Sequence, residues 1–395
     1  MAIHFSDVAT GLHSSEIREL LKLTEQPEMI SFAGGLPAPE LFPLEEMKTV
    51  DERILKEEGR QALQYGPTDG YGMLRRQISD RMNSVYNCKT TAEDILMISG
   101  SQQGLDMVGR VFLNKDDIVL MESPSYLGAI NAFRLSGPKF IAVPTDEQGM
   151  IPEELDKILA AEKRVRMIYV IPDFQNPTGI TWTLERRQKF MEIINRYEIP
   201  VIEDNPYGEL RFEGEILPSL KSLDTKGLVV FLGTFSKIFA PGLRLGWICA
   251  APAILEKCNM LKQAGDLQTS SFAQRQAAFY IDMFDLDAHI QKIKDVYKKR
   301  RDVMLRAIKE NFPEEVKYTY PEGGLFMWVT LPEYMKAKDL MLECIEKKVA
   351  YVPGDSFYPN GGHYNMFRLN YSNMDEERIE LGIKRIAEVI KKHMK

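Results

Sequence analysis

The sequence predicts an α/β protein with a mostly parallel seven-stranded sheet in a large domain and a smaller α+β domain. Two observations carry this prediction. From about residue 95, seven short apolar runs alternate with stretches of helical periodicity, which is typical of a parallel sheet covered by helices on both faces. Beyond residue 316, four more strand-like segments follow a long charged helix, and they indicate a second domain.

The N-terminal part is predicted to form an arm before the large domain. Leucines and Ile17 recur at helical spacing behind two serines over residues 14–23, which favours a short amphipathic helix. Residues 31–39 hold two glycines and two prolines and predict an irregular connector. Residues 44–59 are predicted to be helical again.

Seven apolar runs are predicted as strands of the large sheet, and each is closed by Gly, Pro, Asn or Asp. They cover residues 95–99, 117–121, 139–143, 167–171, 200–202, 228–232 and 246–250. Ligands of such sheets collect beyond the carboxyl ends of the strands. Polar residues that directly follow these runs are therefore the first candidates for a functional site.

The C-terminal part is predicted to begin with a long charged helix over residues 290–309. Strands are expected at 317–320, 324–329, 349–352 and 366–370. We therefore expect an N-terminal helix and arm over 1–43, a large domain over 44–289 and a small domain over 290–395.

Composition argues against several classes of protein. The formal net charge is -7 over 395 residues, and basic residues are scattered instead of forming a stripe, so nucleic acid is not an expected partner. No apolar run approaches the ~20 residues that span a bilayer, and the first residues do not have the pattern of a secretory signal. The 4 cysteines and 5 histidines are scattered, which predicts reduced thiols, no metal site and a cytoplasmic location.

Lys237 is the strongest catalytic candidate, because it lies in an apolar turn directly after the run 228–232. Desolvation lowers the pKa of a lysine, and a neutral amine can attack an aldehyde and hold it as an imine. Ser236 and Arg244 flank this lysine and could hold a phosphate group beside it. The alternative is a surface loop in which the lysine is solvated.

Asp204 and Tyr207 form a second candidate group after the run 200–202. A carboxylate at a strand end could keep a pyridine nitrogen protonated, and the protonated ring would accept electrons from a carbanion. Tyr207 could donate a hydrogen bond to a phenolic oxygen of the same ring. The alternative is that Asp-Asn-Pro simply forms a turn.

Three further strand ends carry candidate ligands. Ser101 and Gln102 begin a predicted helix, whose backbone N–H groups could hold a phosphate, although N-capping alone explains a serine there. Asn176 follows the run 167–171 within Asn-Pro-Thr-Gly, which by itself is a turn. Tyr126 follows the run 117–121 and could stack on a planar ring or lie in the core. Five strand ends thus deliver groups that one phosphorylated, aldehyde-bearing pyridine requires.

In this order along the chain, the stretches resemble the fold-type I aminotransferases that depend on pyridoxal phosphate (PLP), and the resemblance covers almost the whole sequence. It implies that Lys237 binds the cofactor as an imine and shuttles the proton. It also implies roles at the ring and the phosphate for the other candidates: Asp204 at the ring nitrogen, Asn176 and Tyr207 at the ring oxygen, Tyr126 stacked on the ring, and Ser101, Gln102, Ser236 and Arg244 at the phosphate. Tyr65, from the neighbouring subunit of a homodimer, would join the phosphate ligands.

The resemblance also implies a substrate site. Arg368 matches the clamp for the α-carboxylate, assisted by Asn176 and the Gly34–Gly35 backbone; a surface arginine paired with an acid is the alternative. The most similar group is that of 2-aminoadipate and kynurenine aminotransferases, in which a mobile N-terminal helix covers the substrate. Arg18 matches an arginine that grips a distal carboxylate, unless it simply faces solvent. Asp173 stands where this group usually has an uncharged residue, a departure that bears on the charge of the pocket.

The predicted reaction is a ping-pong transfer of an amino group from an L-amino acid (2-aminoadipate, aromatic or branched-chain) to a 2-oxo acid, with 2-oxoglutarate expected. Two alternatives stay open at the sequence level. A lyase or decarboxylase would use the same fold and cofactor. A PLP-binding regulator domain would follow a DNA-binding module, but only about 95 residues precede the first strand and they contain no basic helix-turn-helix pattern.

Overall fold

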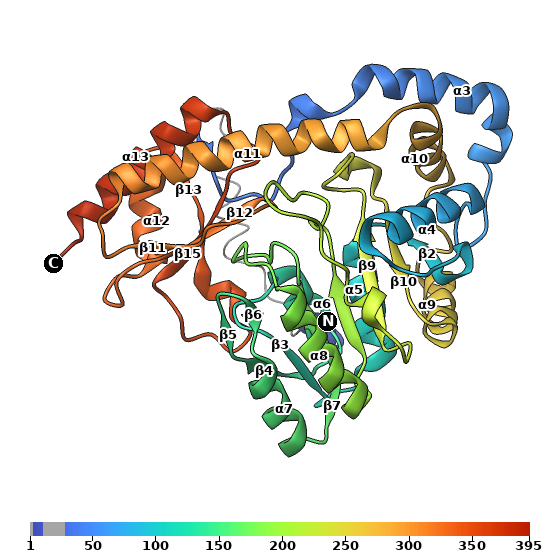
Figure 1. Ribbon diagram of the computed structural model, residues 1–395, viewed down its shortest axis with the longest axis horizontal. Coiled ribbons are helices and arrows are strands. Elements are labelled where there is room, and N and C mark those ends of the chain that lie inside the picture. The colour runs from blue at the N-terminus through green and yellow to red at the C-terminus, as the bar shows by residue number, and fades with distance from the viewer. Residues whose placement is uncertain (1–2, 11–27) are drawn as a thin grey trace.

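The computed structural model describes residues 3–10 and 28–395, and it contains a seven-stranded sheet and a four-stranded sheet in separate parts of the molecule (Figure 1). The predicted helix at 14–23, and with it Arg18, lies outside the described residues. Within the described residues, none of the helices is long and apolar enough to cross a membrane.

The large sheet has the order β2-β10-β9-β8-β7-β3-β4, and all of its strands lie parallel except β10, which is antiparallel to both neighbours. The strands are β2 (Ile95–Ile98), β3 (Ile118–Glu122), β4 (Lys139–Val143), β7 (Val165–Val170), β8 (Val201–Asp204), β9 (Val229–Thr234) and β10 (Gly246–Cys249). Each strand overlaps its predicted run. The predicted fold class, with its mostly parallel seven-stranded sheet, is confirmed.

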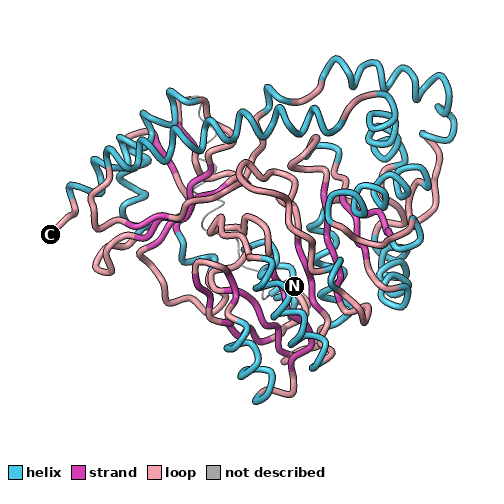
Figure 2. Tube along the Cα trace, in the orientation of Figure 1, coloured by secondary structure: helices cyan, strands magenta, loops and turns pink. Residues whose placement is uncertain are grey.

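The central strands are apolar throughout because both faces of the sheet are covered. Met167 and Tyr169 of β7 face one apolar core, whereas Ile168 and Val170 face the other. This alternation follows from the two-residue period of a strand. A continuous apolar run is therefore what a parallel sheet between two helical layers requires, and Figure 2 shows helices on both sides of these strands.

Nine α-helices of the described residues come before residue 284 in the chain. They are α1 (Asp7–Thr10), α3 (Leu44–Ala62), α4 (Gly72–Tyr86), α5 (Ser101–Phe112), α6 (Leu127–Arg134), α7 (Pro152–Ala161), α8 (Leu184–Tyr197), α9 (Pro252–Gly265) and α10 (Ser271–Met283). A short hairpin, β5 (Thr145–Asp146) with β6 (Gly149–Met150), precedes α7.

The small sheet is antiparallel, in the order β11-β12-β15-β14. Its strands are β11 (Lys317–Tyr318), β12 (Phe326–Thr330), β14 (Val352–Pro353) and β15 (Met366–Asn370), and its helices are α12 (Ala337–Glu346) and α13 (Glu376–Lys392). The segment predicted as one strand at 349–352 is divided in two. Val349–Ala350 forms β13, which pairs in parallel with β1 (Ile30–Ser31), whereas β14 pairs with β15.

The long helix α11 (Leu286–Asn311) runs from the end of α10 toward α13 and so connects the two parts of the molecule (Figure 1). It begins four residues before the predicted helix start. The domain bounds at residues 43/44 and 289/290 stay predictions. Because β1, the first strand of the described residues, pairs with β13, the segment that follows β1 is held next to the small sheet and near the carboxyl ends of the large one.

Candidate active site

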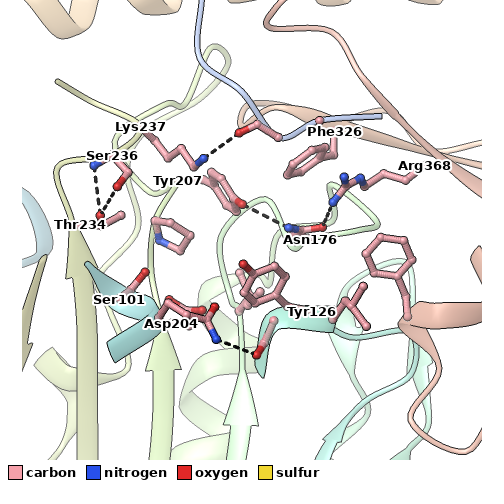
Figure 3. Close-up of a pocket in the computed structure, with 18 of the residues that line it drawn as sticks. Ser101, Tyr126, Asn176, Asp204, Tyr207, Thr234, Ser236, Lys237, Phe326 and Arg368 are labelled. Carbon is pink, nitrogen blue, oxygen red and sulfur yellow. Dashed lines mark hydrogen bonds between the residues drawn. The ribbon is translucent and has the colours of Figure 1, made fainter. Parts of the chain in front are cut away.

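A cavity of about 520 Å³ lies beyond the carboxyl ends of β2, β3, β7, β8 and β9, and its lining comes from both sheets (Figure 3). The structure brings into this lining nearly all of the predicted site residues: Gly34, Gly35, Ser101, Gln102, Tyr126, Asn176, Asp204, Tyr207, Ser236, Lys237, Arg244 and Arg368. Tyr65 is not among them, and its side chain is 77% exposed. The five strand ends therefore do converge on one space.

Lys237 lies three residues beyond β9 and points into the cavity, where its Nζ donates a hydrogen bond to the carbonyl oxygen of Gly35 at 2.8 Å. A carbonyl does not neutralise an ammonium as a carboxylate would. Desolvation lowers the pKa of Lys237 to about 8, and the positive charges of Arg368 and Arg244 act in the same direction. A substantial fraction of this amine is therefore neutral, and able to act as a nucleophile, near pH 8.

Asp204 is the last residue of β8 and is only 2% exposed. Tyr169 donates a hydrogen bond from its hydroxyl to Oδ2 at 2.8 Å, but the buried Oδ1 has no hydrogen-bond partner. Burial raises the pKa of Asp204 to about 7, against the opposing effect of the Tyr169 hydrogen bond. An unpartnered buried carboxylate oxygen is costly, and a protonated ring nitrogen in the cavity is a group that would satisfy it.

Asn176, Tyr207 and Arg368 form a chain of hydrogen bonds across the cavity (Figure 3). The Nδ2 of Asn176 donates to the Tyr207 hydroxyl at 3.4 Å, and its Oδ1 accepts from Nη1 of Arg368 at 2.7 Å. Burial raises the pKa of Tyr207, so the phenol stays protonated and able to donate. Arg368 also donates to the carbonyl of Ala33 at 2.7 Å, while its buried Nε is unpartnered. Three adjacent segments thus present donors to one space.

The opposite end of the cavity suits an anion. Ser101 and Gln102, the first two residues of α5, line the cavity together with Ser236 and Arg244, so the start of a helix, where backbone N–H groups lack intrahelical partners, borders the site. Gly100 has φ +82°, and a Cβ at this position would collide with the guanidinium of Arg244. Glycine is therefore required for the close approach of Arg244 to this turn. Serine hydroxyls, helix N–H groups and a guanidinium together match a phosphate group.

Asp173 does not line the cavity, although the sequence places it three residues from Asn176. Its carboxylate is 2% exposed and forms an ion pair at 2.6 Å with Arg187, which is 0% exposed. The charged residue at position 173 therefore forms an ion pair behind the cavity wall and adds no unpaired charge to the cavity itself.

Several residues that build the site were not predicted from the sequence. Tyr169 holds Asp204, and a phenol within the apolar run 167–171 was the signal that could have identified it. Thr234 donates to the hydroxyl of Ser236 at 2.9 Å. Phe326 and Phe357 enclose the Arg368 guanidinium, at 4.1 and 5.1 Å from their ring centroids. Nothing in the local sequence of these two aromatic residues distinguishes them from core residues. Among the residues that the structure describes, no cluster of His, Cys, Asp or Glu could hold a metal ion.

Replacement of Asp204 by asparagine is expected to stabilise the cofactor-free protein at pH 8 by on the order of 2–4 kcal/mol. The pKa of Asp204 is about 7 in the folded protein against an ordinary value of 3.8. Between these two pH values the unfolded chain has released this proton, whereas the folded protein still holds it. The free energy of unfolding of the wild-type protein therefore falls as the pH rises from about 4 to about 7. Asparagine does not titrate, and the difference should grow over this range and then level off.

Urea unfolding of the cofactor-free wild-type and variant proteins between pH 4 and 8 measures this difference. Parallel stability curves over the whole range would show that Asp204 does not have the raised pKa.

A family model, related sequences and a solved structure all indicate similarity to aminotransferases. The family model for aminotransferase class I and II matches residues 32–386. The aromatic-amino-acid aminotransferase 1 of Thermococcus litoralis is 46% identical, over 99% of this chain and 95% of its own length, and the 2-aminoadipate transaminase of Thermus thermophilus is 42% identical, over 98% and 96%. The structure of a kynurenine aminotransferase from Pyrococcus horikoshii, in complex with PMP, superposes with a TM-score of 0.96 at 45% identity, covering 99% of this chain and 98% of its own.

Proposed function

Because the chain belongs to the class I and II aminotransferases, and so transfers amino groups between amino acids and 2-oxo acids with PLP as cofactor, we propose that its preferred donor is an L-amino acid with an aromatic side chain. We further propose 2-oxoglutarate as the acceptor. This proposal rests on the observation that Lys237, Asp204 and Arg368 line one cavity whose outer wall is mainly apolar.

The residues at the inner end of the cavity fit the cofactor. PLP, when bound, supplies an aldehyde that an amine can attack and a pyridine ring that accepts electrons from a carbanion. We assign Lys237 as the amine that binds it and moves the proton, Asp204 as the partner of the ring nitrogen, and Tyr126 as the stacking residue. The unpartnered Oδ1 of Asp204 is the feature that supports this fit most directly.

The remaining ligands complete the proposed cofactor site. Asn176 and Tyr207 would donate to the ring oxygen, because their hydrogen-bonding groups face the cavity next to Lys237. The phosphate would be held at the start of α5 and in the loop after β9, by Ser101, Gln102, Ser236 and Arg244.

A homodimer is proposed because Tyr65 does not line the cavity of its own chain. Its side chain is 77% exposed, while the next residue is fixed by a hydrogen bond from the Gly66 N–H to the Oε1 of Gln268. An exposed tyrosine on a fixed segment is available to reach the phosphate site of a second copy. Light scattering of the purified protein tests the dimer. A cytoplasmic location is also proposed, and four buried cysteines without disulfides support it.

The substrate would lie between the cofactor and the small sheet. Arg368 would bind the α-carboxylate, with Asn176 and the backbone of Gly34 and Gly35 beside it. Beyond these groups the wall is formed by Leu127, Asn131, Val352 and Phe357. Apolar walls with one amide favour an aromatic side chain over a carboxylate.

Arg18 is the residue that would add a positive charge for a donor with a distal carboxylate, such as 2-aminoadipate. A half-reaction screen, which follows the cofactor absorbance with one amino acid at a time, tests the donor. We expect phenylalanine, tyrosine or kynurenine to react fastest. If 2-aminoadipate were fastest, and an Arg18→Gln variant lost only that reaction, the proposed preference would be wrong.

Replacement of Arg368 by glutamine is expected to lower kcat/KM for amino acid donors by on the order of 100-fold, mainly through KM. Glutamine keeps a donor but loses the paired guanidinium hydrogen bonds and the charge. Steady-state kinetics with the preferred donor measures the effect. Arg306→Gln is the matched control, because Arg306 forms an exposed ion pair with Glu380 on the outer surface. Equal kinetics for the two variants would contradict the assignment of Arg368.

A further inference from the structure

A buried ion pair lies directly behind the loop that carries Asn176. Arg187 donates to both carboxylate oxygens of Asp173, at 2.6 Å to Oδ1 and 3.2 Å to Oδ2, and both side chains are almost completely buried. Arg187 also donates to three carbonyl oxygens, those of Pro172, Trp182 and Pro218. The guanidinium is thus fixed by five hydrogen bonds, and Asp173 is fixed by the guanidinium.

Asp173 has a second partner on the neighbouring strand end. Asn205, which directly follows Asp204, donates from Nδ2 to the Oδ2 of Asp173 at 3.1 Å. The Oδ1 of the same amide accepts from the backbone N–H of Gly208 at 3.0 Å, and so closes the turn that contains Tyr207. Two other ionisable groups lie near the Asp173–Arg187 ion pair. They are Tyr86, whose hydroxyl donates to Asn205, and Glu203, whose carboxylate accepts from two backbone N–H groups.

The hydrogen-bonded series Arg187–Asp173–Asn205, called the bridge below, lies where the pairing of β7 with β8 ends. The ladder between β7 and β8 stops at the pair Val170 and Glu203. Beyond it, the two segments are joined by the side-chain hydrogen bonds Asp173–Asn205 and Asn176–Tyr207. The first of these is buried below the cavity and anchored by Arg187, whereas the second is at the cavity surface and is long, at 3.4 Å. The relative position of Asn176 and Tyr207 therefore depends on the bridge beneath them.

We propose that Asp173 is a positioning residue for the reaction: anchored by Arg187, it fixes the distance between the Asn176 loop and the Tyr207 turn, and thereby the two hydrogen bonds to the ring oxygen of the cofactor. This inference rests on the proposed roles of Asn176 and Tyr207. Hydrogen bonds that stabilise the anionic ring oxygen also favour loss of the proton from the Lys237 nitrogen in the cofactor-bound protein. Asp173 would thus influence the protonation of Lys237 without touching the cofactor.

The test is the pKa of the Lys237 nitrogen in the cofactor-bound Asp173→Asn variant, read from the pH dependence of the visible absorbance. An amide at residue 173 has one acceptor oxygen, so its NH2 must face a donor, either that of Arg187 or that of Asn205. If the bridge positions Asn176 and Tyr207, their hydrogen bonds weaken and this pKa should rise by about 1 unit. If Asn176 and Tyr207 kept their positions, the loss of the negative charge at residue 173 alone would instead lower this pKa. The sign therefore separates positioning from simple electrostatics, and a lowered or unchanged pKa would overturn the proposal.

A neutral double variant, Asp173→Ala with Arg187→Gln, guards against failure of the single variant to fold. It removes the bridge and leaves no unpaired buried charge. We expect the same rise in pKa and a loss of turnover on the order of ten-fold. A wild-type pKa in a folded double variant would overturn the proposal as well.

Two controls separate this inference from its premise and from general destabilisation. Tyr207→Phe should itself raise the pKa; if it does not, the proposed role of Tyr207 at the ring oxygen is wrong, whatever Asp173 does. Asp224→Asn removes another buried ion pair, in which Asp224 accepts from Lys221 at 3.1 Å and from the N–H groups of Leu228 and Val229 at the opposite end of the sheet. It should lower the melting temperature and leave the pKa unchanged.

Discussion

Replacement of Lys237 by alanine is expected to reduce transamination by at least about 10⁴-fold. The lysine would serve both as the amine that binds the cofactor and as the group that moves the proton, so one substitution removes two functions. Its Nζ is the only amine in the described lining of the cavity, and its nearest partner is the carbonyl of Gly35. Turnover with the preferred donor, together with the absorbance of added PLP, measures both losses.

Lys262 provides the matched control, because it is a buried lysine, only 1% exposed, and is not part of the cavity lining. Burial lowers the pKa of Lys262 too, but Asp266 lies 2.9 Å from its Nζ and opposes that effect. A lysine with a carboxylate partner remains a charged structural group. Lys262→Met should therefore keep turnover within a few-fold of wild type. Retained turnover in Lys237→Ala would contradict the central assignment.

The inner half of the site could be predicted from the sequence because it depends on strand order alone. Parallel strands end at the same edge of a sheet, so a polar residue just after each apolar run must lie near the others. Ser101, Tyr126, Asn176, Asp204 and Lys237 follow five different runs, and all five line one cavity. The prediction did not require the order of the strands within the sheet.

The outer half could not be predicted in the same way, because it depends on how the small sheet packs against the large one. Phe326 and Phe357 are apolar residues in an apolar context, and only tertiary packing places them on Arg368. The division of residues 349–352 into two strands has a similar origin. Ile30 and Ser31, more than 300 residues earlier, pair with the first half and not with the second.

Buried polar pairs were equally inaccessible to sequence analysis. The period of a strand shows which face a side chain occupies but does not identify its partner from another segment. The sequence alone therefore leaves open whether Asp173 adds charge to the pocket or changes its substrate preference, whereas the structure places its carboxylate behind the wall and pairs it with Arg187.

Replacement of Asp204 by asparagine is expected to reduce turnover by on the order of 10²–10³-fold while the protein still folds. Asparagine preserves the shape and an oxygen that can accept from Tyr169, which now donates to Oδ2 at 2.8 Å. What it removes is the negative charge that would keep the ring nitrogen protonated, and with it the stabilisation of the carbanion at the substrate. Single-turnover rates of the half-reaction measure the loss, because they exclude product release.

Glu203 is the matched control for this substitution, since it is the adjacent residue on the same strand and is 0% exposed. Burial raises the pKa of Glu203 to about 7, the same value as for Asp204. Because successive side chains of a strand point to opposite faces, Glu203 points away from the cavity, and its carboxylate accepts from the N–H groups of Leu220 and Lys221. Glu203→Gln should therefore change the stability but keep the half-reaction rate within a few-fold of wild type.

Comparison of the variants at Asp204 and Glu203 separates effects on stability from effects on the reaction rate. Asp204→Asn is expected to be more stable than wild type without cofactor at pH 8 and yet far slower, because the unpartnered Oδ1 that costs stability is the group that the cofactor needs. Glu203 has backbone partners for its carboxylate and no such conflict. If Asp204→Asn were slower only in proportion to a loss of stability, or if Glu203→Gln were equally slow, the charge at residue 204 would have no special role.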